Sequence, residues 1–165
     1  MDPTNTKALA SPLRTSQVST KPREEVLLQY FRTSQSVREV MLDIVDGSDL
    51  TPDEFVVLSV IGELRAVTPT ELAERLGMPP TTISRYAARF VSEGLAVRAV
   101  NPSDGRSYFL EVTTQGRAVL SKIVPRLRRA NQQLAELMDV VAMSSALAHF
   151  EEALGTVSNG ATADV

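Results

Sequence analysis

The sequence from residue 68 to residue 94 reads TPTELAERLGMPPTTISRYAARFVSEG and contains two helix-forming segments with a short turn between them. The first segment begins with the capping box TPTE at residues 68–71, in which a threonine cap and a glutamate satisfy free N–H groups of the first turn. It ends at Gly77, since glycine accepts the positive φ that closes many helices. Two prolines at residues 79–80 open a second helix, predicted over residues 81–93. The stretch therefore predicts a helix, a tight turn and a second helix.

The second helix of this pair has an apolar face and a polar face. Ile83, Ala87 and Phe90 follow the spacing of one helical face and are predicted to point into a core. Short hydroxyls and arginines occupy another face, and such groups contact phosphates and base edges when a helix lies in the major groove. These candidate DNA-contacting residues are Thr81, Thr82, Ser84, Arg85 and Arg89. The alternative is an ordinary helical hairpin with a solvated outer face.

Two strand-like runs follow directly, at residues 95–100 and 107–112. The segment between them, NPSDGR at residues 101–106, is dense in turn-forming residues, so a β-hairpin is predicted. A hairpin that follows a helix-turn-helix is a wing, and Arg106 at its tip can enter a narrow minor groove, where the negative potential is enhanced. DNA would repel Asp104, so we expect Asp104, with Gly105, to shape the wing by capping the turn or by holding an arginine.

Helical periodicity extends on both sides of this motif. Before it, apolar residues at spacings of three and four predict a helix over residues 23–46, and a second capping box, TPDE at residues 51–54, opens an apolar helix. After the wing, Thr113 is predicted to cap a helix over residues 114–138, and a last helix follows over residues 140–154. The predicted fold class is mainly α (α+β), with six helices and a β-hairpin wing.

The chain divides into three predicted regions. Residues 1–22 are rich in serine, threonine and proline and are predicted to form a flexible arm. Residues 23–154 carry the folded domain, in which terminal helices over residues 23–46 and 114–154 flank a winged helix-turn-helix over residues 50–113. Residues 155–165 are predicted to be a disordered tail.

Composition excludes several classes of function. The chain has 165 residues, which suits one domain, and it contains no cysteine and one histidine, His149. Thiol chemistry is excluded, and the sequence shows neither a nucleophile with its base nor a glycine-rich phosphate loop, so we expect no enzyme, no cofactor and no metal site. No apolar run approaches the roughly 20 residues of a membrane span, and no signal peptide is evident. We therefore expect a cytoplasmic protein without a membrane partner.

The charge is distributed unevenly along the chain. Residues 75–130 hold ten basic and three acidic side chains, a net charge of +7, whereas the rest of the chain carries −10. A basic segment in an acidic protein suggests a surface that binds a polyanion, although solvated helix faces would give the same count. The charge therefore supports a nucleic-acid partner only together with the motifs.

Residues 68–116 resemble the winged helix-turn-helix of the MarR (multiple antibiotic resistance regulator) family. The motifs that match are TELA at residues 70–73, PPTTISR at residues 79–85 and DGRS at residues 104–107. The flanking helices match in order and length. The resemblance adds Thr70 to the candidate DNA-contacting residues. One departure is Met78, where the family usually has a serine or a similar helix cap.

The resemblance implies a homodimer in which the first, fifth and sixth helices interleave with those of a second subunit. It also implies a small lipophilic or phenolic effector, bound between the dimerisation helices and the DNA-binding lobe. Candidate pocket residues are Tyr30, Phe31 and Phe55, although aromatic residues at helical spacing more often form plain core.

The sequence therefore predicts a homodimeric transcriptional regulator, most simply a ligand-responsive repressor, that binds a pseudo-palindromic operator in double-stranded DNA. The alternative is a winged-helix protein-interaction module without DNA binding. Such a module is not expected to keep Arg85, Arg89 and Arg106 all exposed on one face, so the exposure of these three arginines discriminates between the two functions.

Overall fold

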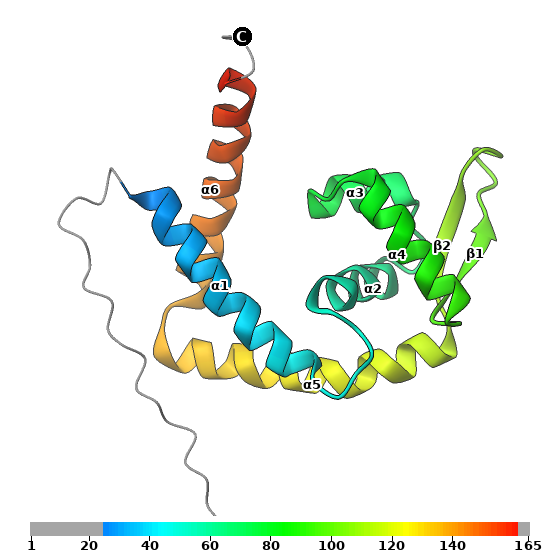
Figure 1. The fold of residues 1–165 in the computed structure, drawn as a ribbon, viewed down its shortest axis with the longest axis horizontal. Helices are drawn as coiled ribbons and strands as arrows, with labels where there is room; N and C mark the ends of the chain where they lie inside the picture. The colour runs from blue at the N-terminus through cyan, green and yellow to red at the C-terminus, as the bar shows by residue number, and fades with distance from the viewer. Residues whose placement is uncertain (1–24, 162–165) are drawn as a thin grey trace, which may run out of the picture. The chain divides into compact units, whose positions relative to one another are not determined.

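The computed structural model describes residues 25–161, which form six helices and one β-hairpin, as predicted (Figure 1). Two compact units are distinguished along the chain, one ending at Val37 within the first helix and the other beginning at Arg38. The predicted arm of residues 1–22 lies outside the described residues. The elements are α1 (Val26–Val45), α2 (Pro52–Leu64), α3 (Pro69–Leu76), α4 (Pro80–Ser92), β1 (Ala96–Val100), β2 (Tyr108–Val112), α5 (Thr114–Leu137) and α6 (Val140–Ala161).

Local capping chemistry sets the boundaries of α2 and α3. Thr51 Oγ1 accepts the N–H of Glu54 at 3.3 Å, and the Glu54 carboxylate accepts the N–H of Thr51 at 2.9 Å, so the predicted capping box forms. Thr68 and Glu71 build the same box at the start of α3. Gly77 closes α3 with φ of 59°, in the left-handed region that glycine tolerates without strain.

The start of α4 differs from the expectation. Its cap position is Pro79 rather than Met78, and no side chain caps its first turn. Met78 is instead half-buried against the core, and its N–H donates to the Ala73 carbonyl at 3.1 Å. Met78 therefore belongs to the end of α3, and the missing hydroxyl cap is explained by a turn that two prolines have already fixed.

The hydrophobic core lies among α2, α3, α4 and the hairpin. The predicted inner face of α4 is buried in this core, since Ile83, Ala87 and Phe90 are each almost fully covered. α2 is buried over most of its circumference, which explains its largely apolar sequence. The largest fully buried side chains are Phe55, Phe90, Leu58, Ile61, Leu72, Ile83 and Leu110.

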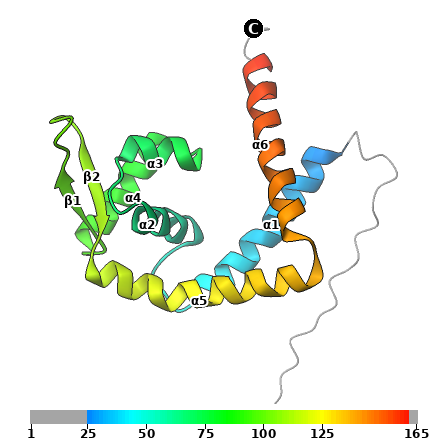
Figure 2. The ribbon, with the colours of Figure 1, turned by 180° about the vertical axis from the view of Figure 1, so that it is seen from behind.

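The two strands pair antiparallel, with Ala96 opposite Val112 and Val100 opposite Tyr108. Val67, in the loop before α3, adds an isolated bridge to Leu110 through two backbone hydrogen bonds of 3.4 and 2.8 Å. This bridge was not predicted from the sequence, and it joins the middle of β2 to the loop before α3. The far end of the hairpin projects beyond α3 and α4 in both views (Figures 1 and 2).

The hairpin passes into α5 at a crowded junction. Thr113 caps α5 as predicted, because its Oγ1 accepts the N–H of Gly116 at 3.0 Å, and it also donates to the Gly94 carbonyl at 2.6 Å. A Cβ on Gly116 would lie 2.2 Å from the Leu95 carbonyl oxygen and 2.7 Å from a Val112 methyl. The junction therefore requires glycine at this position.

The last helix is longer than predicted. Asp139 Oδ1 accepts the N–H groups of Val141 and Ala142, each at 3.0 Å, and so caps the start of α6. α6 continues to Ala161, so the prediction of a disordered tail is wrong for residues 155–161, while residues 162–165 lie outside the described part. Glycine and polar residues suggested a tail, but extending an existing helix costs far less than nucleating one. No helix in the described part is long and apolar enough to cross a membrane.

Candidate nucleic-acid interface

The first turns of α4 present the polar face that the sequence predicts. Thr81, Ser84 and Arg85 are exposed, and Thr82 is half-buried. The Arg85 guanidinium lies 5.3 Å from the centroid of the Tyr86 ring, which is itself buried and stacked on Phe90. The buried ring supports the Arg85 guanidinium through a cation–π contact, while the residue stays exposed. On α3, Thr70 is exposed in the first turn, beside the capping box.

Arg89, one turn further along α4, points elsewhere and requires a correction. Its Nε donates to Glu93 at 2.8 Å, one terminal nitrogen donates to the Glu54 carboxylate, and the other donates to the Asp49 carbonyl at 2.7 Å. The Arg89 side chain is 35% exposed. Two of these three bonds are directed to α2 and to the loop before it, so the structure places Arg89 among the groups that hold α4 and not on the free polar face.

Glu54 is the residue that the sequence reasoning missed. It is 4% exposed, so burial raises the pKa of its carboxyl, but the hydrogen bonds from Thr51 and Arg89 outweigh burial and hold this pKa below its ordinary value. The pKa of Arg89 is raised in turn, first by its hydrogen bond to Glu93 and then by Glu54. A glutamate at the third position of a capping box gives no sign in the sequence that it also pairs with an arginine 35 residues away.

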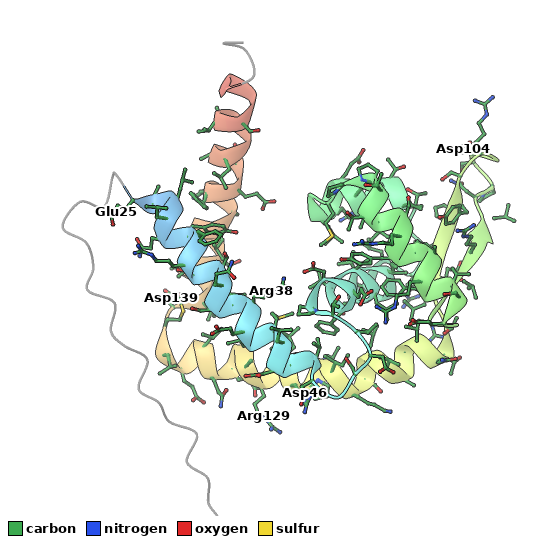
Figure 3. The ribbon with its side chains drawn as sticks, in the orientation of Figure 1. Glu25, Arg38, Asp46, Asp104, Arg129 and Asp139 are labelled. Carbon is green, nitrogen blue, oxygen red and sulfur yellow. The ribbon has the colours of Figure 1, made fainter. Side chains whose placement is uncertain are left out.

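The far end of the hairpin has the geometry expected of a wing. Asp104 Oδ1 accepts the N–H of Arg106 at 3.0 Å, and the Asp104 carbonyl accepts the N–H of Ser107, also at 3.0 Å. Asp104 therefore caps the turn, one of its two predicted roles, and Figure 3 shows it at the tip. Arg106 is exposed there. Gly105 is exposed with open space around its Cα, and its φ lies outside the left-handed region, so its backbone does not demand glycine.

The hairpin carries a second arginine that was not singled out. Arg98 of β1 is exposed, and its guanidinium lies 4.5 Å from the centroid of the Tyr108 ring on β2. The two residues are diagonal neighbours, because Arg98 pairs with Leu110. The strand register could have revealed this contact, but the register is known only once the turn is fixed.

The three aromatic pocket candidates differ in exposure. Phe55 is 1% exposed and belongs to the core, whereas Tyr30 and Phe31 are exposed on the first half of α1. The structure therefore gives Phe55 the plain core role and not a pocket role.

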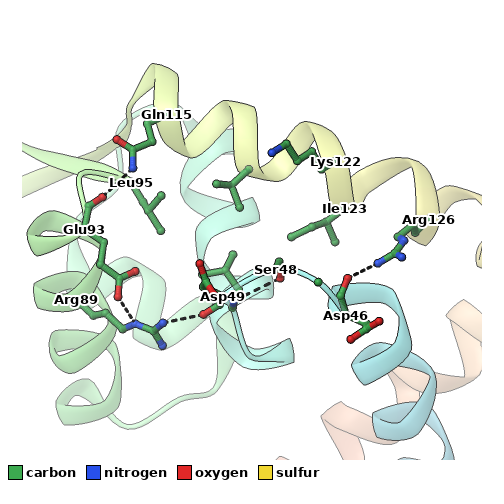
Figure 4. Close-up of a pocket in the computed structure, with 13 residues that line it drawn as sticks. Asp46, Ser48, Asp49, Arg89, Glu93, Leu95, Gln115, Lys122, Ile123 and Arg126 are labelled. Carbon is green, nitrogen blue, oxygen red and sulfur yellow. Dashed lines mark hydrogen bonds and ion pairs between the residues drawn. The ribbon is translucent and has the colours of Figure 1, made fainter.

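Two cavities lie along α5 instead. One, of about 820 Å³, is bounded by the loop between α1 and α2, the end of α4 and α5 (Figure 4). The other, of about 410 Å³, lies between α2 and α5. The acidic and histidine side chains of residues 25–158 form no cluster suited to a metal ion.

Comparisons with known proteins fit this arrangement. A family model described as the MarR family matches residues 48–107. Among relatives, the HTH-type transcriptional regulator YxaD of Bacillus subtilis is 31% identical over 113 residues, which are 67% of this chain and 79% of YxaD. The HTH-type transcriptional repressor YetL of B. subtilis is 28% identical over 103 residues, which are 61% of this chain. The match spans 62% of YetL, less than two thirds of its length.

A solved structure shares both fold and moderate sequence similarity. The transcriptional regulator MosR of Mycobacterium tuberculosis, determined in complex with DNA, superposes with a TM-score of 0.68 at 26% identity. The superposition covers 79% of this chain and 96% of the MosR chain. The likeness therefore extends beyond the helix-turn-helix to most of the fold.

Proposed function

Because this chain belongs to the MarR family, we propose that it is a homodimeric transcriptional regulator that binds a pseudo-palindromic DNA operator. In this proposal each subunit places the first turns of α4 in a major groove and the hairpin tip at the adjacent minor groove. The observation that carries it is the joint exposure of Thr81, Ser84 and Arg85 on α4 and Arg106 on the wing. These are the donors and short hydroxyls that read base edges and phosphates.

Exposed apolar side chains on α1 and α6 support a dimer. In the single chain α1 exposes large apolar side chains along its length, with Phe31 62% exposed, and α6 exposes Val141 and Leu147. Faces of this kind are uncommon on a monomer unless they serve an interface. A second copy that covers both helices is the simplest occupant, since a two-fold dimer also supplies the second recognition helix that a pseudo-palindrome needs.

Repression is the mode that we favour for this regulator. The relative YetL is named a repressor, and a dimer that covers an operator blocks access by its volume alone. The expectation that Arg85, Arg89 and Arg106 are all exposed is met only for Arg85 and Arg106, since the Arg89 side chain is 35% exposed. The exposure of the other two still favours DNA binding over the alternative, a winged-helix module that binds protein.

DNA binding by the full-length chain tests the proposal. We expect the dimer to bind random duplex DNA at low salt and a selected operator more tightly. The log–log salt dependence should have a slope of about −5, as for about six neutralised phosphates. Fluorescence anisotropy over a salt series, together with the mass in solution, measures both properties. A chain that binds neither DNA at low salt is the interaction module.

Ligand responsiveness is best supported at the cavity between α2 and α5. Ser59 Oγ is buried there and has no hydrogen-bond partner among the described residues. Pro125 has no N–H to offer the Ser121 carbonyl one turn earlier, and both residues line the same cavity. Leu120 and Val124 add apolar walls, and Arg128 adds positive charge. These groups suit a small phenolic anion, and thermal shifts with a panel of phenolic carboxylates, compared between the natural chain and Ser59→Val, test it.

A further inference from the structure

The loop between α1 and α2, residues 46–50, is held by arginines from two sides (Figure 4). From α5, Arg126 donates to the carbonyl oxygens of Asp46 and of Ile44, the latter at 3.2 Å. From α4, Arg89 donates to the Asp49 carbonyl at 2.7 Å. The loop is therefore a hydrogen-bonded link between α5 and the proposed recognition helix.

Apolar packing and hydrogen bonds both hold this link, since Leu50 of the loop and Ile123 of α5 are buried in the hydrophobic core. The cavity of about 820 Å³ lies between the loop and α5, and the loop residues line it together with Arg89 and Arg126. The end of α4 is also bonded directly to the start of α5, because the Gln115 amide donates to the Glu93 carbonyl at 3.1 Å. Arg89 and Arg126 are the side chains that bond the loop to α4 and to α5.

Arg89 and the proposed DNA-contacting residues lie at opposite ends of α4, so a small tilt of the helix about Arg89 displaces those residues. Arg89 lies in the last turn of α4, and Thr81 lies in the first. Eight residues of α-helix separate them, about 12 Å along the axis, so a tilt of ~5° about the Arg89 end moves Thr81 by ~1 Å. A polar contact made by a functional group tolerates a displacement of only about 0.5 Å. Small changes at Arg89 are therefore sufficient to misplace the DNA-contacting turn.

We propose that Arg89 and Arg126 are positioning residues for DNA recognition: acting through residues 46–50, they fix the angle of α4 against α5 and so set the spacing of the two recognition helices in the dimer. This inference rests on the proposed function. It differs from direct contact, because Arg89 donates to Glu93, Glu54 and Asp49, and one terminal nitrogen of Arg126 donates to two main-chain carbonyls.

The test uses the full-length chain and a duplex that it selects from a random pool. Two further duplexes carry one base pair inserted or removed at the centre, which changes the half-site separation by about 3.4 Å. The variants are Arg89→Met and Arg126→Met. The matched controls are Arg85→Met, one turn earlier on α4, and Lys122→Met, one turn earlier on α5 at the wall of the same cavity.

We expect Arg89→Met and Arg126→Met to bind the selected duplex about tenfold more weakly, as for one mismatched base pair. The loss of affinity on the duplexes with altered half-site separation should be smaller for these two variants than for the natural chain. The slope of log affinity against log salt concentration should equal that of the natural chain. Arg85→Met should lower affinity yet keep the spacing penalty, and Lys122→Met should keep both. Arg89→Lys, which retains the charge but loses the forked geometry, replaces Arg89→Met if the latter does not fold.

Other outcomes overturn the inference. A salt slope lower by about two per dimer for Arg89→Met, with the spacing penalty intact, would identify Arg89 as a phosphate contact. If Arg126→Met and Lys122→Met show the same relative affinities for the three duplexes, residues 46–50 do not link α5 to α4. If the natural chain selects no duplex and binds no DNA at low salt, the proposed function itself fails, and the positioning role fails with it.

Discussion

Glu54 combines two tasks in one carboxylate. It completes the capping box of α2 and pairs with Arg89 of α4, while only 4% exposed. Glu54→Gln keeps an acceptor for Thr51 but removes the charge, so we expect about 1–2 kcal/mol lower unfolding free energy at pH 7. Urea denaturation measures the loss. Glu63→Gln, an exposed position on the same helix, should change stability by less than about 0.5 kcal/mol.

The same residue predicts how stability depends on pH. The pKa of Glu54 in the folded chain lies below its ordinary value of 4.5, so the unfolded chain takes up the proton first. The stabilisation is therefore complete at neutral pH and is lost as the pH falls through 4.5 towards the folded pKa. Denaturation curves of the natural chain and Glu54→Gln should converge below that pH. A difference that persists unchanged at acid pH would mean that the ion pair is not its source.

Replacing Arg85 or Arg106, the two arginines proposed to contact DNA, is expected to affect binding in different ways. Arg85→Ala should relax base preference at one position of each half-site, where a bidentate contact discriminates by about 1–3 kcal/mol. Arg106→Ala should weaken binding to many sequences, most where A·T-rich flanks narrow the minor groove. Competition binding with a base-substituted and flank-substituted operator set separates them. Both variants should melt with the natural chain, since both side chains are exposed.

For individual residues, the sequence predicted the chemical character of a helix face better than the contacts that each side chain makes. Arg85 and Arg89 stand one helical turn apart, so periodicity places them on one face and cannot tell them apart. The difference comes from Glu54, which is distant in sequence and reaches Arg89 only after α2 packs against α4. By contrast, the role of Asp104 was predictable, because its partners lie within three residues.

At the junction of the hairpin with α5, there is no room for a side chain on Gly116. We expect Gly116→Ala to lower the unfolding free energy by about 3 kcal/mol, because the added methyl meets the Leu95 carbonyl oxygen at 2.2 Å and backbone must shift. Gly105→Ala at the wing tip is the matched control, with open space around it and no left-handed φ. Thermal and urea unfolding measure both. Equal stability of the two variants would show that the junction can relax.

The predicted elements match where local chemistry decides them. Four helix ends depend on residues that lie close together in the sequence, and all four form as predicted. They are the two capping boxes, the Thr113 cap and the end of α3 at Gly77. The bridge of Val67 to Leu110 was not predicted, because a single pairing between distant residues leaves no periodic trace. The end of α6 was missed for a related reason, since composition suggested a tail where the helix simply continues.

For the molecule as a whole, association should govern measured stability. If α1 and α6 form the dimer interface, the melting temperature should rise with protein concentration. Leu147→Lys on α6 should then weaken the dimer, because it adds a charge to a buried apolar surface. Val100→Lys, on a wing residue that is 85% exposed, should leave the mass in solution unchanged. Light scattering during gel filtration over a dilution series measures both. A natural chain that stays monomeric when concentrated would contradict the proposed interface.

The two capping boxes, TPDE at residues 51–54 and TPTE at residues 68–71, should tolerate different substitutions of their glutamates. Among the residues that the structure describes, Glu71 is hydrogen-bonded within its own first turn, and it is exposed, so replacing it should loosen one short helix and little else. Glu54 sits in an identical local motif, yet any replacement must also satisfy an arginine on another helix. In a library that randomises both boxes, functional clones should accept aspartate, glutamine or serine at position 71 and reject most substitutions at position 54. Two copies of one short motif should therefore differ in their tolerance of substitution, because their glutamates make different tertiary contacts in the folded chain.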